Sequence, residues 1–515
     1  MALVRFAATV GGYTMASRIL GFVRDILIAA VVGTGPVADA FFVAFKLPNF
    51  FRRLFAEGAF NAGFVPLFSK ILEVEGRAAA KLFAERALSL LLVILLVFVT
   101  GFQIAMPWAM HGLAPGFVDE PWKFDLTVTL TRLTFPYLLL ISLVSLLAGV
   151  LNSMRRFAAA ASAPIILNLC LIAGLTLFAD VGRTPGHALA WAVSIAGICQ
   201  FLWLMLACRR AGMGLRLRRP RLSPRVAKLM RLILPAAIGA GVVQVNMVID
   251  IILASLLPSG SVSFLFYADR LNQLPIGVVG VAIGTALLPL ISRHLAAGEE
   301  GAANAVLNRA LEVALILTLP AAAAFLVIPD EVIAVLFERG AFDAHSTAMT
   351  AAALAAYATG LPAYVLVKIL GPAFFGRLDI KTPVVVGGIA VVANLILNLI
   401  LMWFFLHVGL AMATAISAWL NVALLALILR RRSQFEPDRR LLEKLAKAVL
   451  ATVVMVLCLG LAGWALSPLF EGGVALRFGG LAALVVTGLA VYGLAALALG
   501  IVSPTQLRTL LARGS

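Results

Sequence analysis

Long apolar runs separated by short polar segments dominate the chain. Fourteen runs are long enough to cross a bilayer as a helix, which takes about 20 residues. No period-two alternation recurs along them, so the pattern predicts helices and not a barrel. The runs lie near 7–32, 38–68, 87–110, 126–153, 159–180, 186–208, 232–257, 264–292, 310–328, 349–376, 383–406, 409–429, 445–467 and 478–502. The fold class predicted is an all-α polytopic membrane protein with 14 transmembrane helices.

The basic residues of the loops are divided very unequally between the two sides of the membrane. One alternating set of loops carries 28 Lys and Arg residues and the opposite set carries four. The richer set comprises 69–86, 154–158, 209–231, 293–309, 377–382, 430–447 and 503–515. Because basic loops stay in the cytoplasm, we predict that both termini are cytoplasmic. The net charge of +17 lies mostly in these loops, which explains it without a nucleic-acid partner, and no nucleic-acid motif is present.

Composition supports a membrane protein that holds no cofactor. Hydrophobic residues make up 62% of the chain and charged residues only 13%, whereas a soluble chain has about 25% charged residues. The four cysteines lie in or beside apolar runs without metal-ligand spacing, so neither a disulfide framework nor a zinc site is expected. No cleavable signal peptide is predicted, because charge interrupts the first apolar run.

An internal repeat divides the first twelve runs into two halves. Prolines, glycines and basic residues recur in the same order at offsets between 219 and 227, as in PLFSK at 66–70 and PLISR at 289–293. Six runs per half place both halves in one orientation, as a pseudo-two-fold parallel repeat. We therefore predict an N-terminal six-helix lobe (1–220), a C-terminal six-helix lobe (221–433) and two extra helices (434–515). The linker 209–231 is basic and long enough for an amphipathic helix.

Charged residues inside the apolar runs are the main functional signal. A charge at mid-depth costs at least about 2.5–3.5 kcal/mol, so such residues face a watery cavity or a partner. Eight are basic and five acidic: Arg18, Arg24, Lys46, Arg52, Arg53, Arg132, Arg270 and Lys368, with Asp25, Asp39, Glu57, Asp250 and Asp269. The surplus of cations favours an anionic ligand. Amphipathic surface helices, or ion pairs that only lock helices together, are the alternative interpretation.

Helix-breaking residues accompany these charges. A helix restarting at Pro48-Asn49 would direct its N-terminal amides, together with Arg52 and Arg53, at an anion. The Arg53–Glu57 spacing of i, i+4 allows one arginine to be held by an acid while its neighbour stays available. Arginine suits such a site because its fork matches phosphate oxygens bidentately.

Five segments carry a family resemblance: SRILGFVRD at 17–25, DAFFVA at 39–44, KLPN at 46–49, RRLFAEGAF at 52–60 and YADRL at 267–271. In them, and in outline over the whole chain, the protein resembles the MurJ (MviN) family of the multidrug/oligosaccharidyl-lipid/polysaccharide exporter superfamily. The resemblance implies a flippase for lipid II, the undecaprenyl-pyrophosphate-linked disaccharide-peptide precursor of peptidoglycan. It also implies the bacterial inner membrane and alternating access, with membrane lipids and the cell-wall synthesis machinery as further partners.

The resemblance assigns roles to the buried charges. It places Arg18, Arg24, Arg52 and Arg270 in a central cationic cavity that binds the pyrophosphate. Supporting members are Asp39, Glu57, Lys368, Asp25, Arg53 and Asp269. The two extra helices would form an apolar groove for the polyprenyl tail.

A candidate cation site lies in the second half. Asp250, Asn394, Asn398 and Thr414 supply one carboxylate and neutral oxygens, which are ligands that a hard cation prefers. Some relatives are described with a sodium site on matching helices. The alternative is a polar network that joins helices.

Two other classes of protein compete with the flippase. A cation-coupled drug exporter, or an exporter of another polyprenyl-linked oligosaccharide, would share the superfamily, but a drug exporter favours acids in its cavity and twelve helices. A membrane enzyme acting on polyprenyl phosphates should show a catalytic acid pair or a long outer loop, and the largest outer loop, 329–348, is short. We therefore expect a transporter and not an enzyme.

Overall fold

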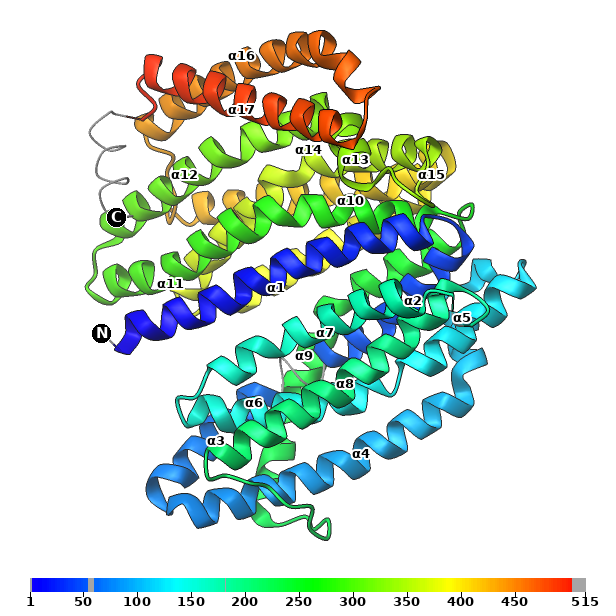
Figure 1. Cartoon of the computed structure of the whole chain (residues 1–515). Helices are drawn as coiled ribbons and strands as arrows, with labels where there is room; N and C mark the ends of the chain where they lie inside the picture. The colour runs from blue at the N-terminus through cyan, green and yellow to red at the C-terminus, as the bar shows by residue number, and fades with distance from the viewer. Residues whose placement is uncertain (1, 54–59, 181, 503–515) are drawn as a thin grey trace. The chain divides into compact units, whose positions relative to one another are not determined.

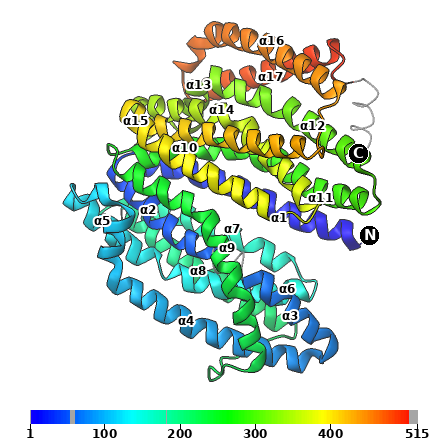
Figure 2. The same ribbon diagram turned by 180° about the vertical axis from the view of Figure 1, so that it is seen from behind.

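The computed structural model describes residues 2–53, 60–180 and 182–502, with side chains except at 2–8, 61–62 and 234–243. Throughout these residues the regular structure is helical and no strand occurs. Ten of the described helices are long and apolar enough to cross a membrane. The all-helical polytopic class is therefore confirmed, while the count of fourteen stays a prediction. The chain forms two compact units (Figures 1 and 2).

The first unit comprises residues 1–263 and 339–342. Its helices are α1 (Ala2–Val32), α2 (Pro36–Phe51), α3 (Phe60–Val74), α4 (Gly76–Leu113), the 3-10 turn η2 (Pro115–Phe117), α5 (Pro121–Thr134), α6 (Tyr137–Ser153), α7 (Ala158–Phe178), α8 (Pro185–Arg210) and α9 (Pro224–Ser255). Stacked phenylalanines fill part of its core, as where Phe64 lies 5.1 Å from Phe60 and 5.6 Å from Phe83 between ring centroids. Aromatic pairs of this kind add stability beyond the area they bury.

The second unit comprises residues 264–338 and 343–515. Its helices are α10 (Ser261–Pro275, whose first turn lies in the first unit), the π-helical turn η3 (Ile276–Gly280), α11 (Val281–Ala296), α12 (Glu300–Val327), α13 (Pro329–Phe337), α14 (Ala344–Phe375), α15 (Lys381–Arg431), α16 (Arg439–Phe470) and α17 (Val474–Ala498). In both views α16 and α17 lie side by side and beside α12 (Figures 1 and 2). The Tyr492 hydroxyl, on α17, donates to the Ile316 carbonyl of α12 at 2.7 Å.

Helix α15 contains two of the predicted spans. Its 51 residues would reach about 76 Å as one straight helix, at 1.5 Å per residue, which is far more than a bilayer's hydrocarbon core. Leu406, the last residue of the predicted run 383–406, breaks the helix with φ 50° and ψ −130°. The next predicted run, 409–429, begins three residues later. The backbone therefore turns where the sequence places a loop.

A close approach of backbones holds the short segment 339–342 in the first unit. The Ala341 amide donates to the Ala30 carbonyl of α1 at 2.8 Å. Gly33 and Gly340 both have positive φ, and a Cβ on Gly340 would lie 2.2 Å from the Ala30 oxygen. Only glycine fits a contact this tight.

The middle of the basic linker between the two sequence repeats is extended and not helical, whereas its last residues, 224–231, belong to α9. Residues 213–223 contain no helix, so an amphipathic helix there is wrong for this stretch. Buried Glu85 of α4 holds the linker by accepting from the Arg216 amide at 3.2 Å and from Arg218 Nε at 2.5 Å. A buried carboxylate needs such partners, and these contacts fix the linker in place of helix formation.

Two turns recur at the spacing of the sequence repeat. At the end of α6, the Arg156 amide donates to the Leu151 carbonyl, with Arg155 at φ 59°. At the end of α14, the Asp379 amide donates to the Phe374 carbonyl, with Leu378 at φ 60°. A second pair of such turns ends α8, at Gly212, and α15, at Ser433. The same helix-ending motif thus stands at equivalent places in the two halves.

Candidate functional site

Arg24 of α1 is buried and held by an acid and an amide. It is 6% exposed. Its Nε and Nη2 donate to Asp25 Oδ1 at 2.9 and 2.6 Å, and its Nη1 donates to Asn168 Oδ1 at 2.8 Å. Asn168, on α7, is oriented by donating to the Ser17 carbonyl at 2.9 Å. The structure therefore joins two predicted site residues, Arg24 and Asp25, to an asparagine that the sequence did not single out.

The other predicted arginines on α1 and just after α2 differ in exposure. Arg18 and Arg53 are exposed, and Arg52 is half-buried with its Nε donating to Asn49 Oδ1 at 3.1 Å. Charged groups exposed on membrane-spanning helices must meet water or head groups and not hydrocarbon. Glu57 lies outside the described residues, so its pairing with Arg53 stays a prediction.

The predicted restart of a helix at Pro48 is wrong. Helix α2 continues through Pro48 to Phe51. Proline lacks an amide hydrogen, which leaves the carbonyl four residues earlier without its helical partner. That carbonyl, on Ala44, accepts from the Thr134 hydroxyl of α5 at 2.9 Å. A side chain from a distant helix thus repairs the break, and no free helix N-terminus is created at this position.

Asp39 lies in a fully buried polar cluster. It is 1% exposed and accepts from the Gly260 amide at 2.7 Å, the Ser263 amide at 2.9 Å and the Ser263 hydroxyl at 2.9 Å. Lys123 Nζ, also 1% exposed, lies 3.3 Å from Asp39 Oδ2. Each of these buried groups has a hydrogen-bonding or charged partner within the cluster. Asp39 therefore stabilises the chain around Gly260 and Ser263.

Asp269 and Arg270 lie in α10. The Arg270 guanidinium lies 4.9 Å from the centre of the Phe266 ring, a cation–π arrangement. Asp269 Oδ1 accepts from Gln273 Nε2 at 3.2 Å. Successive residues on a helix point about 100° apart, so these two charges leave the helix in different directions.

Lys368 of α14 is exposed and lies against the glycines of α11 and η3. A Cβ on Gly280 would be 3.0 Å from Lys368 Cδ, and one on Gly284 would be 2.8 Å from the Lys368 carbonyl. The two helices therefore approach closely at Lys368. A cavity of about 570 Å³ beside it is lined by Lys368, Thr285 and Asn421, among others.

The four residues of the candidate cation site fall into two groups. Asn394, Asn398 and Thr414 form a network in which Asn398 Nδ2 donates to Asn394 Oδ1 at 3.0 Å and Asn394 Nδ2 lies 3.5 Å from Thr414 Oγ1. Asp250 belongs to the other unit and accepts from Asn246 Nδ2 at 3.2 Å. The three neutral side chains thus share a buried hydrogen-bond network, as the alternative interpretation expects.

Lys123 and Asn168 contact the predicted site residues Asp39 and Arg24, and the sequence did not single them out. Lys123 reads as one of four basic residues in outer loops, yet its side chain is buried against Asp39 and 4.0 Å from the Phe117 ring centre. Asn168 reads as an ordinary polar residue of an apolar run. The only available signal was a polar group in or beside a span, which many residues share.

Comparison with known proteins places the chain in one family. The model of the family "Lipid II flippase MurJ" matches residues 28–478. The chain is 43% identical, over all of its length and 97% of the relative, to a probable lipid II flippase MurJ of Rhizobium meliloti (strain 1021). It is 37% identical to the lipid II flippase MurJ of Burkholderia cenocepacia over 90% of each chain.

Solved structures agree with these relatives. A structure of lipid II flippase MurJ in an inward closed conformation has a TM-score of 0.79 at 26% identity, and the match covers 95% of this chain and 97% of that one. An inward-facing MATE family multidrug transporter of the MOP superfamily has a TM-score of 0.67 at 14% identity, covering 83% of this chain and 98% of that one. The second likeness concerns the fold alone.

The Asp39–Lys123 pair generates a prediction about stability. Removing one partner of a buried ion pair costs about 3–5 kcal/mol, because the other charge is left uncompensated. We expect Asp39→Asn and Lys123→Met each to lower the thermal unfolding temperature in detergent. The double variant should lose less than the sum of the two, because neither charge is then left alone.

Glu120 provides the control for this cycle. Its Oε1 lies 3.7 Å from Lys123 Nζ, but the side chain is about half exposed, and exposed pairs contribute about 0–1 kcal/mol. Glu120→Gln should therefore leave the unfolding temperature nearly unchanged. Strictly additive effects of Asp39→Asn and Lys123→Met would contradict the pairing.

Proposed function

The chain belongs to the lipid II flippase MurJ family, and we propose that it moves lipid II from the cytoplasmic to the outer leaflet by alternating access. The observation that carries this is similarity along the whole chain, at 43% identity over its full length. The protein is accordingly a flippase, a transporter and not an enzyme, and the ten apolar helices among its described residues suit a multi-pass inner-membrane protein that serves cell-wall synthesis. Association with other cell-wall proteins stays a prediction.

Arg18, Arg24, Arg52 and Arg270 are proposed to bind the pyrophosphate of lipid II. Arginine forks match phosphate oxygens bidentately, and the exposure of Arg18 and partial exposure of Arg52 support ligand access. Arg53 and Lys368, both exposed, would add positive charge. The supporting acids are Asp25, Asp39, Glu57 and Asp269.

Arg24 requires a further step, because it donates to Asp25 and Asn168. A phosphate would have to take the place of Asp25 at the guanidinium, which makes Asp25 a stand-in for the anion. If Arg24 serves only structure, Asp25 is its permanent partner. The two roles predict different behaviour of an Asp25 variant.

The polyprenyl tail is proposed to lie along α16 and α17, the two helices outside the repeat. Apolar side chains are exposed on α16 at helical spacing, and Leu457, Leu461 and Trp464 are 63%, 69% and 81% exposed. Positions at i, i+4 and i+7 share one face of a helix. The two lobes 1–220 and 221–433 would rock against each other to alternate access.

A drug exporter of the same superfamily is the nearest rival. The MATE-like fold agrees with it, but the cations at Arg18, Arg53 and Lys368 favour an anionic cargo. Transport of lipid II in proteoliposomes containing only this protein separates the two, because a drug exporter would leave lipid II in its original leaflet.

The pyrophosphate proposal predicts the effect of single arginine changes. A charged hydrogen bond contributes about 1.5–3 kcal/mol, so Arg24→Ala, Arg52→Ala and Arg270→Ala should each weaken lipid II binding by about ten- to a hundredfold. Lysine keeps the charge but loses the fork and should recover only part of the affinity. Affinity would be measured in detergent on folded proteins, with Arg132→Ala as the matched arginine control.

Asp25→Asn separates binding from structure. If Arg24 serves only to pair with Asp25, neutralising the acid should restore the stability of Arg24→Ala, and neither variant should change lipid II affinity. Wild-type affinity in all three alanine variants would refute the pyrophosphate assignment.

A sodium ion bound by Asp250, Asn394, Asn398 and Thr414 is proposed as the second ligand. The four side chains offer oxygens of the type that hard cations prefer, although Asn394 Oδ1 and Thr414 Oγ1 already accept from asparagine amide groups. Sodium, compared with potassium, should raise the unfolding temperature of the wild type and not of Asp250→Ala. An equal response to both ions would leave only the polar network.

The orientation with both termini in the cytoplasm is proposed from the basic loops. In a cysteine-free background, Gly473→Cys should label from outside intact cells and Leu222→Cys only after permeabilisation. Both positions suit labelling, since Leu222 is 68% exposed and a Cβ on Gly473 meets nothing within 4 Å. External labelling at Leu222 would invert the orientation.

A further inference from the structure

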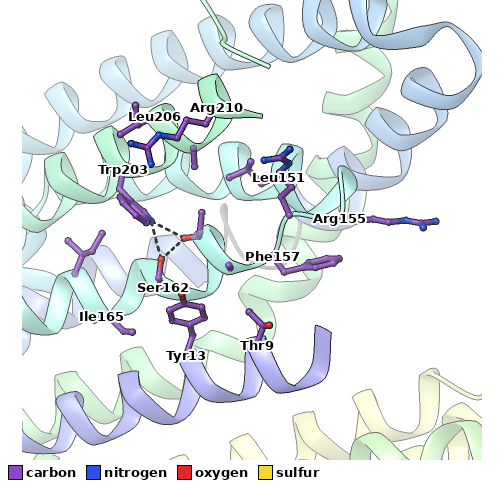
Figure 3. A pocket seen from close by; sticks show the side chains of 15 residues that line it. Thr9, Tyr13, Leu151, Arg155, Phe157, Ser162, Ile165, Trp203, Leu206 and Arg210 are labelled. Atoms are coloured by element: carbon purple, nitrogen blue, oxygen red, sulfur yellow. Dashed lines mark hydrogen bonds between the residues drawn. The ribbon is translucent and has the colours of Figure 1, made fainter. Parts of the chain in front are cut away.

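Two adjoining hollows lie where α6 and α8 end in the first unit. One, of about 590 Å³, is lined by Arg77, Arg156 and Arg210 together with residues of the neighbouring turns. The other, of about 950 Å³, is also lined by Arg155 but has a mainly apolar wall drawn from α1, α7 and α8 (Figure 3). Arg156 and Arg210 line both hollows. The basic hollow and the apolar hollow therefore adjoin at these two arginines.

The basic hollow gathers like charges from three different turns. Arg77 starts α4, Arg156 follows α6 and Arg210 ends α8. No acid lines either hollow among the side chains that the structure describes. Glu75, the acid nearest to Arg77 in sequence, lies 2.5 Å from Arg225 Nη2 instead. Because like charges repel, this arrangement favours an external anion.

The second half of the repeat has an acid at the position that is equivalent to Arg156. The turn that ends α14 places Asp379 where the turn that ends α6 places Arg156. Asp379 accepts from Arg432 Nη1 at 2.7 Å and from the Thr382 amide at 2.9 Å. The second half thus carries its own anion at this position. The first half has an arginine at this position, which suits an anion from outside the chain.

The apolar hollow has a fixed aromatic wall. The Trp203 indole donates to the Ser162 hydroxyl at 3.0 Å and to the Ala159 carbonyl at 3.3 Å, and Tyr13 points toward Ser162 from α1 (Figure 3). Ile165 and Leu206 extend the apolar surface. Trp and Tyr are enriched at the level of lipid head groups, and the basic loops predict the cytoplasmic side here.

We propose that the two hollows bind one anionic phospholipid of the cytoplasmic leaflet. Its phosphate would lie among Arg77, Arg156 and Arg210, and an acyl chain would lie along Trp203 and Leu206. A free anion would use only the basic hollow, whereas a phospholipid has the charge and the hydrocarbon that the joined hollows match. This site is separate from the residues proposed to bind lipid II.

Binding would be measured on the full chain in detergent with dioleoyl phosphatidylglycerol, by native mass spectrometry and thermal unfolding. The zwitterionic dioleoyl phosphatidylcholine and soluble glycerol 3-phosphate serve as comparison ligands. We expect only phosphatidylglycerol to bind with one-to-one saturation and to raise the unfolding temperature. Each basic residue near an anionic lipid contributes a factor of about five, so replacing all three arginines should weaken binding about a hundredfold.

The variant that removes the basic hollow is Arg77→Gln/Arg156→Gln/Arg210→Gln. The matched control, Arg219→Gln/Arg221→Gln/Arg431→Gln, removes three exposed charges elsewhere and should bind like the wild type. Ala207→Phe fills the apolar hollow and should also weaken binding of the phospholipid.

Three results would overturn the proposal. Equal stabilisation by glycerol 3-phosphate would make the site one for free anions, and equal binding of phosphatidylcholine would remove the role of the arginines. Displacement of phosphatidylglycerol by one equivalent of lipid II would assign the hollows to the substrate. The wild-type measurements alone decide each of these, even if the triple variant does not fold.

Discussion

Every charge at membrane depth must be neutralised by a partner or kept in contact with water, and the architecture depends on how this is done. Asp39 and Lys123, both 1% exposed, pair with each other near the first turns of α2 and α5. Arg24 is held by Asp25 and Asn168. A buried charge left without such a partner would cost several kcal/mol. The charges that the fold leaves exposed are the ones that a ligand can reach directly, whereas a ligand of Arg24 would have to take the place of Asp25.

This division refines what the charge surplus means for function. The sequence shows more cations than acids within the apolar runs but not which cations are paired. The structure exposes Arg18, Arg53 and Lys368, while the acids Asp25 and Asp39 are buried. These two acids therefore act within the protein, and the three exposed cations remain accessible. An anionic head group is the cargo that this asymmetry suits.

Much of the helical arrangement could be predicted, because apolar runs and helices obey the same length rule. The predicted run 159–180 matches α7 (Ala158–Phe178), and 349–376 lies close to α14 (Ala344–Phe375). The prediction failed at Pro48 because the Thr134 hydroxyl, remote in sequence, replaces the missing bond. The burial of Lys123 was missed for the same reason. Local patterns give helices and candidate charges, whereas the partner of each charge is a long-range property.

The places where the chain passes between the two units show how these local contacts bear on movement. The first passage follows Ser263, whose amide and hydroxyl bind Asp39. The segment 339–342 is held by the Ala341–Ala30 bond. Each passage is therefore attached to the first unit by hydrogen bonds of 2.8–2.9 Å. If the two units move during transport, the change in backbone angles must occur outside these contacts, because they hold Ser263 and the segment 339–342 to the first unit.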